Sequence, residues 1–183
     1  MIADAVAQAA VAQDLGDWIW ARHTNEFSWY IRPLFLLPMA WAAYRRSAWG
    51  IALSVLGLVT SMAWFPAPAE PDPQVLAFIE FEQQWVAADW SPSKIVFSLL
   101  APLALVAYCT AFWRRSLTWG LVVLNAMALG KILWATVSED GGVAVVVPAL
   151  AGLAVGNVVL LLAVREVRRR RRREGAHPAS IAR

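Results

Sequence analysis

Two basic residues, Arg32 and Lys131, lie inside long apolar stretches of this 183-residue sequence. A cation within an apolar segment is costly to bury, so such residues are candidates for ligand binding. Acidic and aromatic residues at a similar predicted depth complete a polar site. The predicted pocket consists of Arg32, Lys131, Glu82, Glu26, Trp29 and Trp134. Its two cations favour a small anionic or zwitterionic ligand, such as a metabolite or a lipid headgroup.

A structural interpretation of the same charges is also open. Arg32 and Lys131 could extend their charged ends toward the membrane surface, or pair with glutamates to hold a surface helix on the bundle. Glu82 falls in the middle of an apolar helical arc, where it must pair or take up a proton.

Other chemistry has little support in the sequence. It contains no Ser-His-Asp arrangement, HExxH, glycine-rich phosphate loop or CxxC motif. His23 and Glu26 have a spacing that suits a metal, but the further ligands of a metal site are lacking. We therefore interpret His23 as a solvated or helix-capping histidine and expect no metal and no cofactor. An enzyme using Asp17, His23 or Glu26 at the outer face remains the second alternative.

Composition places these residues in a membrane protein. The chain is 60% hydrophobic and 16% charged, against about a quarter charged in soluble domains, and it has eleven tryptophans. Crossing about 30 Å of hydrocarbon takes about 20 apolar residues. Five stretches meet this requirement: Asn25–Tyr44, Ala48–Phe65, Pro92–Trp113, Leu117–Val137 and Val143–Val164. The third begins with Ser91 as its N-cap and Pro92 as its first residue.

A repeated pattern organises the first four stretches. Pro33, Arg45-Arg46-Ser47 and Trp49-Gly50 recur as Pro102, Arg114-Arg115-Ser116 and Trp119-Gly120, with twelve positions from proline to arginine in both copies. The pattern predicts two tandem helical hairpins, 24–65 and 92–137, followed by a fifth helix, 143–164. The fold class is thus an all-α polytopic bundle of five transmembrane helices. Arg32 corresponds to Ala101, and Lys131 to Ser61, so neither charge is repeated, which suits a single site.

Charge orients the predicted bundle. With five spans, twelve of the sixteen lysines and arginines fall on one side and eleven of the thirteen acidic residues on the other. The positive-inside rule then places the N-terminus outside and the C-terminus in the cytoplasm of a bacterial-type plasma membrane. Met1–Gln13 has no basic residue, so we do not expect a signal peptide. The basic tail, 165–183, is expected to be disordered, with Arg168–Arg173 attracting anionic lipid headgroups rather than nucleic acid.

The remaining segments connect or pack the spans. Residues 1–23 form an outer segment, and 66–91 combine a proline-rich linker with an amphipathic interfacial helix, Gln74–Asp89. Asn125 and Asn157 should face neighbouring helices. Gly152 and Gly156 offer a close-approach face, for packing within the chain or for a homodimer or another membrane protein. A structural or assembly subunit of a membrane complex is therefore the first alternative function.

Overall fold

The computed structural model describes residues 2–137 and 143–175, and within them the chain is helical with no strand. The elements, in chain order, are α1 (Ile2–His23), α2 (Glu26–Ile31), η1 (Arg32–Phe35), α3 (Leu36–Tyr44), α4 (Ala48–Thr60), η2 (Ser61–Ala63), α5 (Pro73–Ala87), α6 (Pro92–Trp113), α7 (Leu117–Val137) and α8 (Val143–Gly175), where η1 and η2 are 3-10 helices. Three of the described helices contain segments long and apolar enough to cross a membrane: Pro92–Trp113, Leu117–Trp134 and Val145–Val167. The predicted all-helical membrane architecture is confirmed at this level.

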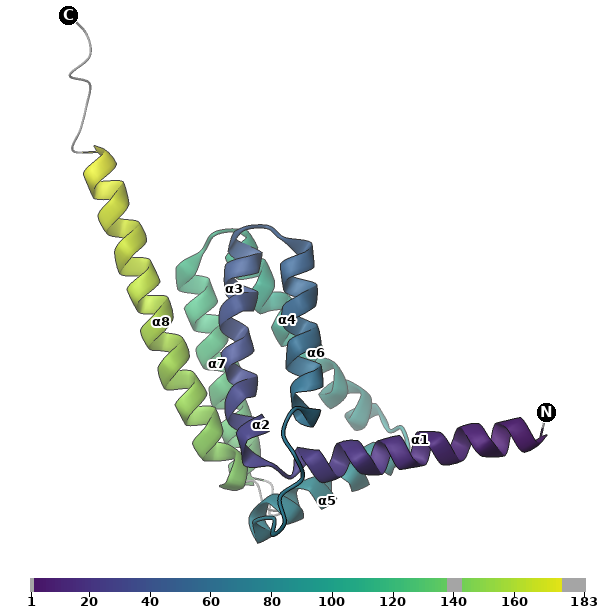
Figure 1. The fold of residues 1–183 in the computed structure, drawn as a ribbon. Helices are drawn as coiled ribbons and strands as arrows, with labels where there is room; N and C mark the ends of the chain where they lie inside the picture. The colour runs from purple at the N-terminus through teal and green to yellow at the C-terminus, as the bar shows by residue number, and fades with distance from the viewer. Residues whose placement is uncertain (1, 138–142, 176–183) are drawn as a thin grey trace, which may run out of the picture.

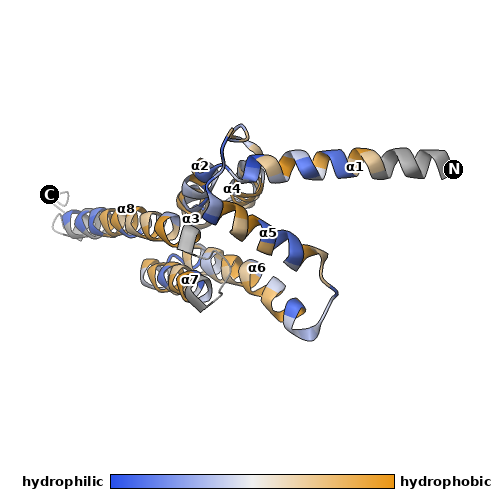
Figure 2. Ribbon diagram, turned by 90° about the horizontal axis from the view of Figure 1, so that it is seen from below, coloured by the Kyte–Doolittle hydropathy of each residue, from blue (hydrophilic) through white to orange (hydrophobic). Residues whose placement is uncertain are grey.

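Figure 1 shows a bundle in which α3, α4, α6 and α7 stand side by side, with α8 packed at a tilt against them. The α3–α4 and α6–α7 turns lie together at one end. At the other end α5 crosses below the bundle, and α1 projects sideways from it. Hydrophobic residues dominate α6, α7 and most of α8, whereas α1 and α5 mix hydrophilic and hydrophobic residues (Figure 2). The bundle thus carries apolar side chains on its outer surface, as a hydrocarbon environment requires.

The two turns that join the helical hairpins have the same backbone geometry. Arg46 and Arg115 both adopt a left-handed conformation with φ 57°, a conformation that ends many helices. The N–H of Ser47 donates to the carbonyl of Ala42, and the N–H of Ser116 donates to the carbonyl of Ala111. Each serine side chain then accepts a hydrogen bond from the first turn of the next helix. One serine therefore closes one helix and begins the other.

The predicted first span, Asn25–Tyr44, is not one continuous helix. It is divided into α2, the 3-10 segment η1 and α3. Pro33 and Pro38 lack an N–H, so two helical hydrogen bonds are missing within five residues. The backbone tightens here, and the N–H of Leu36 donates to the carbonyl of Pro33 three residues before it.

The helical segment at the predicted second span is shorter than expected, because α4 ends at Thr60 and η2 at Ala63. At about 1.5 Å per residue, Ala48–Ala63 covers about 24 Å, less than the hydrocarbon core. The helical corner between α1 and α2 supports this early end. Arg22 donates to the carbonyl of Ala63, and Asn25 donates to the carbonyl of Pro66, both at 2.9 Å.

The later elements follow the prediction more closely. The helices α6 and α7 have the predicted bounds, and Ser91 caps α6 by accepting a hydrogen bond from the N–H of Lys94. The helix α8 continues through the arginine run to Gly175, so the prediction of disorder directly after Val164 is wrong over these residues. Residues 176–183 lie outside the described part of the chain. The helix α1 was not predicted.

Within the described residues, the larger of two apolar cores and a polar pair lie between the helices of the bundle. Met39, Ala43, Tyr108 and Phe112 are buried where α3 and α6 meet. Asn125 on α7 and Asn157 on α8 donate to each other's side-chain oxygens at 2.9 and 3.1 Å, which confirms that they face neighbouring helices. Because both amides are satisfied within the bundle, the pair fixes the register of α7 against α8.

The two glycines of α8 contact neighbours within the chain. A Cβ atom at Gly152 would lie 2.3 Å from the Pro33 ring, and one at Gly156 would lie 3.1 Å from Leu124. Gly152 therefore allows α8 to approach η1, and Gly156 allows it to approach α7. Their predicted role in helix packing is realised inside the molecule, and this face is not open to a second protein.

We expect Gly152→Ala to lower the free energy of unfolding by about 1–3 kcal/mol, because the proline ring cannot move away from the added methyl group. Gly130 on α7 is the matched control, since a Cβ there meets nothing within 4 Å. Gly130→Ala should be neutral or stabilising by about 0.5–1 kcal/mol. Unfolding of the purified protein in mixed micelles measures both. Equal effects of the two substitutions would contradict the assigned packing.

Candidate functional site

His23, the last residue of α1, is the centre of a polar cluster at the end of the bundle that α5 crosses. Its side chain is buried, with 2% of the residue exposed. Nε2 of its ring lies 3.1 Å from the Glu82 carboxylate on α5, and Nδ1 lies 3.0 Å from the Arg32 guanidinium. The Trp29 indole N–H donates to the backbone carbonyl of His23 at 2.9 Å. One imidazole thus joins α1, α2, η1 and α5.

The neighbours of His23 select one tautomer. Arg32 and the Trp29 indole, at 3.3 Å, are both donors directed at Nδ1, and neither of them can accept a hydrogen bond. Nδ1 must therefore be the acceptor, and the hydrogen of the neutral ring lies on Nε2. That hydrogen is donated to Glu82. The interpretation of His23 as a solvated residue is wrong, because the structure buries it between an acid and a base.

Lys131 lies close enough to Arg32 and Glu82 to interact electrostatically with both. It is repelled by Arg32 and attracted by Glu82, and Arg32 is likewise attracted by Glu82. Lys131 forms no hydrogen bond or ion pair with a described residue, and its side chain is exposed. Glu82 instead forms its hydrogen bond with His23. Arg32 and Lys131 are therefore both attracted to the Glu82 carboxylate, which is already hydrogen-bonded to His23.

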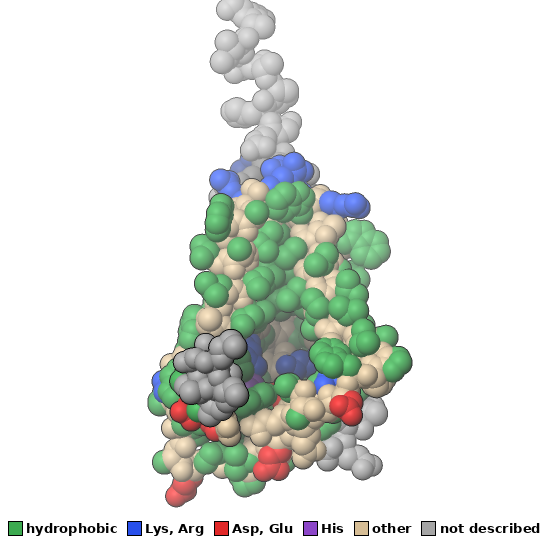
Figure 3. All heavy atoms as spheres, turned by 90° about the vertical axis from the view of Figure 1, so that its right-hand side faces the viewer, with side chains coloured by type: hydrophobic (Ala, Val, Ile, Leu, Met, Phe, Trp, Pro, Cys, Tyr) green, Lys and Arg blue, Asp and Glu red, His purple; other side chains and the backbone are tan. Residues whose placement is uncertain are grey.

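Figure 3 shows a hollow in the face of the bundle that turns toward the projecting end of α1. Lysine or arginine atoms and histidine atoms are visible inside it, and acidic side chains lie below it. Hydrophobic side chains cover the surface between the hollow and the basic end of the molecule. The charged interior of the hollow can be reached from the side of the bundle.

The other predicted pocket residues have different positions. Trp29 is buried against Phe78 of α5, with ring centroids 5.3 Å apart, and Trp134 packs on Phe97 of α6 at 4.7 Å. Glu26 is exposed at the start of α2 and forms no hydrogen bond or ion pair with the described residues of the cluster. The structure therefore brings Arg32, Lys131 and Glu82 together with Trp29, whereas Glu26 lies apart from them.

The amphipathic helix α5 is held at both ends. Val75 and Ile79 are buried with Trp29 and Val145, as the predicted apolar arc required, but Val86 on the same arc is exposed. Beyond α5, the buried ammonium of Lys94 donates to the carbonyls of Val86 and Ala88. The sequence analysis missed Lys94, which satisfies the C-terminal end of α5 and fixes the corner to α6.

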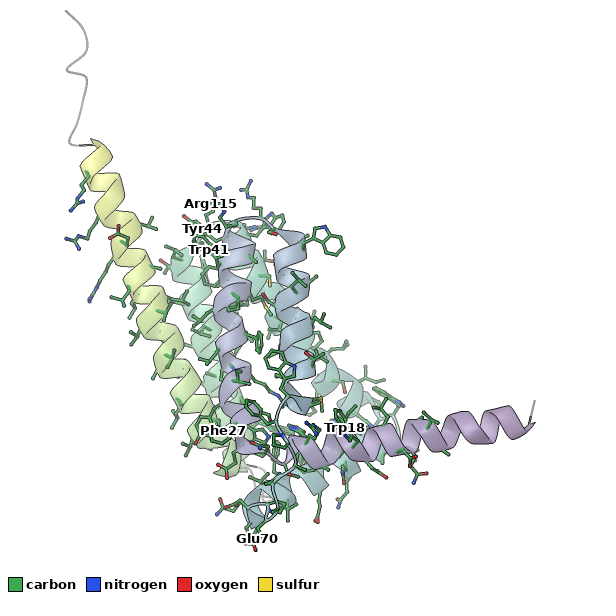
Figure 4. All side chains as sticks on the ribbon, viewed as in Figure 1. Trp18, Phe27, Trp41, Tyr44, Glu70 and Arg115 are labelled. Carbon is green, nitrogen blue, oxygen red and sulfur yellow. The ribbon has the colours of Figure 1, made fainter. Side chains whose placement is uncertain are left out.

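The opposite end of the bundle is basic and aromatic. Arg115 stacks over the Tyr44 ring at 5.6 Å, and Arg45 stacks over the Trp41 ring at 5.9 Å. Figure 4 shows Arg115, Tyr44 and Trp41 gathered at this end, with Trp18, Phe27 and Glu70 toward the other. Aromatic residues with cationic side chains are typical of a membrane–water boundary.

The described residues contain no group of three or more histidine, cysteine or acidic side chains that could hold a metal ion. No protein-family model, no curated protein and no solved structure matches the chain. The geometry of the cluster is therefore the basis for inferring a function.

We expect Glu82→Leu and His23→Leu each to lower the free energy of unfolding by about 1.5–3 kcal/mol. Glu82→Leu leaves the buried His23 ring without its acceptor, and His23→Leu removes the partner of both Glu82 and Arg32. Combining the two should cost less than the sum of the single effects. Glu80→Leu is the matched control, since Glu80 is exposed on the same helix. Unfolding in mixed micelles provides the comparison. Strict additivity would show that the imidazole and the carboxylate do not interact.

Proposed function

We propose that the protein binds a small anionic or zwitterionic ligand through Arg32 and Lys131 at the outer end of a membrane bundle. The observation that carries this proposal is the charge balance of the cluster. Its two cations face one carboxylate, Glu82, and that carboxylate already accepts a hydrogen bond from the His23 ring. The cluster thus has one uncompensated positive charge, which an anion would neutralise.

The cost of an unmatched charge supports this proposal. Two cations that repel each other outside bulk water are unfavourable without a counter-ion. Lys131 is about 9 Å below the outer end of α7, six residues before Val137. An anion between Arg32 and Lys131 would convert repulsion into two charge-assisted contacts.

The purely structural interpretation accounts for only part of the cluster. It explains the three residues that hold α5 to the bundle, which are Glu82 and its partner His23, and Arg32, which also binds His23. For Lys131, which forms no hydrogen bond with a described residue, it offers only extension of the ammonium toward the membrane surface. The assembly-subunit alternative relied on Gly152 and on the apolar face of α5, and both contact this chain.

We further propose that the bundle has five membrane spans arranged as two tandem hairpins and a fifth helix, with its N-terminus outside. The matching left-handed turns at Arg46 and Arg115 support the hairpin repeat. The α2–η1–α3 column would be the first span and α4 with η2 the second. The arginines at the two turns support a cytoplasmic location for that end. The apolar stripe Val11, Leu15 and Trp18 would then place α1 along the outer membrane surface.

We expect Lys131→Gln to weaken binding of inorganic phosphate and glycerol phosphate about tenfold or more, since each loses a charge-assisted hydrogen bond. The apparent Tm without ligand should stay the same or rise, because the repulsion of Arg32 is removed. Isothermal titration and thermal unfolding of the detergent-solubilised protein measure the two effects.

Arg45→Gln is the control, since Arg45 is an exposed cation at the opposite end. It should leave anion binding unchanged. Anion binding by the Lys131 variant at full strength would refute the ligand site, and so would loss of its fold.

The proposed orientation predicts that a cysteine replacing Ala69 reacts with a membrane-impermeant maleimide on intact cells, in a Cys109→Ala background. A cysteine replacing Ala48, at the arginine-bearing end, should react only after the membrane is permeabilised. Labelling yields on gels decide between the orientations. The reverse pattern would show that the arginine-bearing end is outside.

A further inference from the structure

A second feature of the hollow face is an apolar groove between α4 and α6, with α3 as its floor. Its volume is about 440 Å³, and Arg114 and Trp113 close its basic end. The groove is lined by Met39, Ile51, Val55, Leu105, Val106 and Cys109. All of these side chains are apolar or weakly polar, so the groove fits hydrocarbon rather than a hydrated solute.

The groove and the cation cluster are aligned along one helical column. Met39 in α3 follows Arg32 in η1 by seven residues, so the cation and a lining residue of the groove belong to one helical column. At about 1.5–2 Å per residue, the two residues are about 10–14 Å apart along that column. In Figure 3 hydrophobic side chains extend from the charged hollow toward the basic end. Charge at one end and apolar lining beyond it match the shape of a lipid.

We propose that the ligand is an anionic phospholipid of the outer leaflet. This inference rests on the proposed function and specifies its ligand. Its phosphate lies between Arg32 and Lys131, and one acyl chain occupies the groove between α4 and α6. The early end of α4 at Thr60 leaves this entrance uncovered on the membrane side. The uncompensated positive charge selects an anionic over a zwitterionic headgroup.

The lipid has a direct route to this site. Residues around the groove on α4 and α6, such as Leu53, Val106 and Leu103, expose large apolar surfaces outward. In a bilayer these surfaces contact lipid chains, so a lipid already adjacent to the protein need only turn its chain inward. A water-soluble anion would instead have to pass the acidic residues and α5 at the outer end.

The test uses the full-length protein in nanodiscs with phosphatidylglycerol carrying a diazirine on its acyl chain, and peptide mapping of the cross-links. Cross-links should concentrate on α4 and α6 around Val55 and Val106. Lys131→Gln should reduce them about tenfold or more. Phosphatidylcholine with the same chain should compete at least about tenfold less well than unlabelled phosphatidylglycerol.

A groove-filling variant separates the lipid inference from the anion site. Val106→Trp should reduce the cross-links but leave binding of glycerol phosphate unchanged, whereas Val158→Trp, on the exposed face of α8, should change neither. Val55→Trp provides the same comparison from the opposite wall if Val106→Trp does not fold.

The outcomes are distinguishable. If glycerol phosphate binding depends on Lys131 but the cross-links avoid the groove, the proposed function stands and the lipid assignment is overturned. Equal competition by phosphatidylcholine overturns the anionic selectivity. If neither glycerol phosphate nor phosphatidylglycerol responds to Lys131→Gln, both proposals fail.

Discussion

The hydrogen bonds of one buried imidazole determine how α1, η1 and α5 meet at one end of the bundle. His23 accepts from Arg32 and donates to Glu82, and its backbone carbonyl accepts from the Trp29 indole. The segment from His23 to Arg32 and the distant helix α5 thereby meet at one ring. Because Glu82 is engaged by a neutral histidine, it does not pair closely with Lys131. The electrostatic imbalance of the hollow is a direct consequence of this arrangement.

Backbone constraints create the space that the charges occupy. Pro33 and Pro38 interrupt the first helical column, and Pro33 packs against Gly152, which brings α8 close to the break. The short α4 ends at Thr60, and Arg22 and Asn25 from the α1–α2 corner donate to the carbonyls of Ala63 and Pro66 in the segment that follows it. The bundle is therefore closed around η1 and open between α4 and α6. A lateral hollow with a polar interior follows from these local features.

The sequence predicted the parts of the fold that depend on local rules. Apolar length and the Ser91-Pro92 start fixed the bounds of α6, and the asparagines were correctly expected to face neighbouring helices.

Failures came from interactions between distant segments. Burial of His23 depends on Glu82, 59 positions away, so its spacing to Glu26 was misleading. From the sequence, Lys94 is indistinguishable from an ordinary interfacial lysine, because its carbonyl partners belong to the end of a neighbouring helix. Its structural role could not be read from periodicity.

The central claim is that the hollow holds two cations whose charge exceeds that of their protein partners. An electron cryomicroscopy structure of the protein, gently extracted with its native lipids, tests this most directly. We predict non-protein density within hydrogen-bonding distance of both Lys131 Nζ and the Arg32 guanidinium, extending between α4 and α6, with Glu82 still on His23. A structure in which Lys131 is paired with a carboxylate of the chain, and in which the hollow contains no such density, would contradict the account.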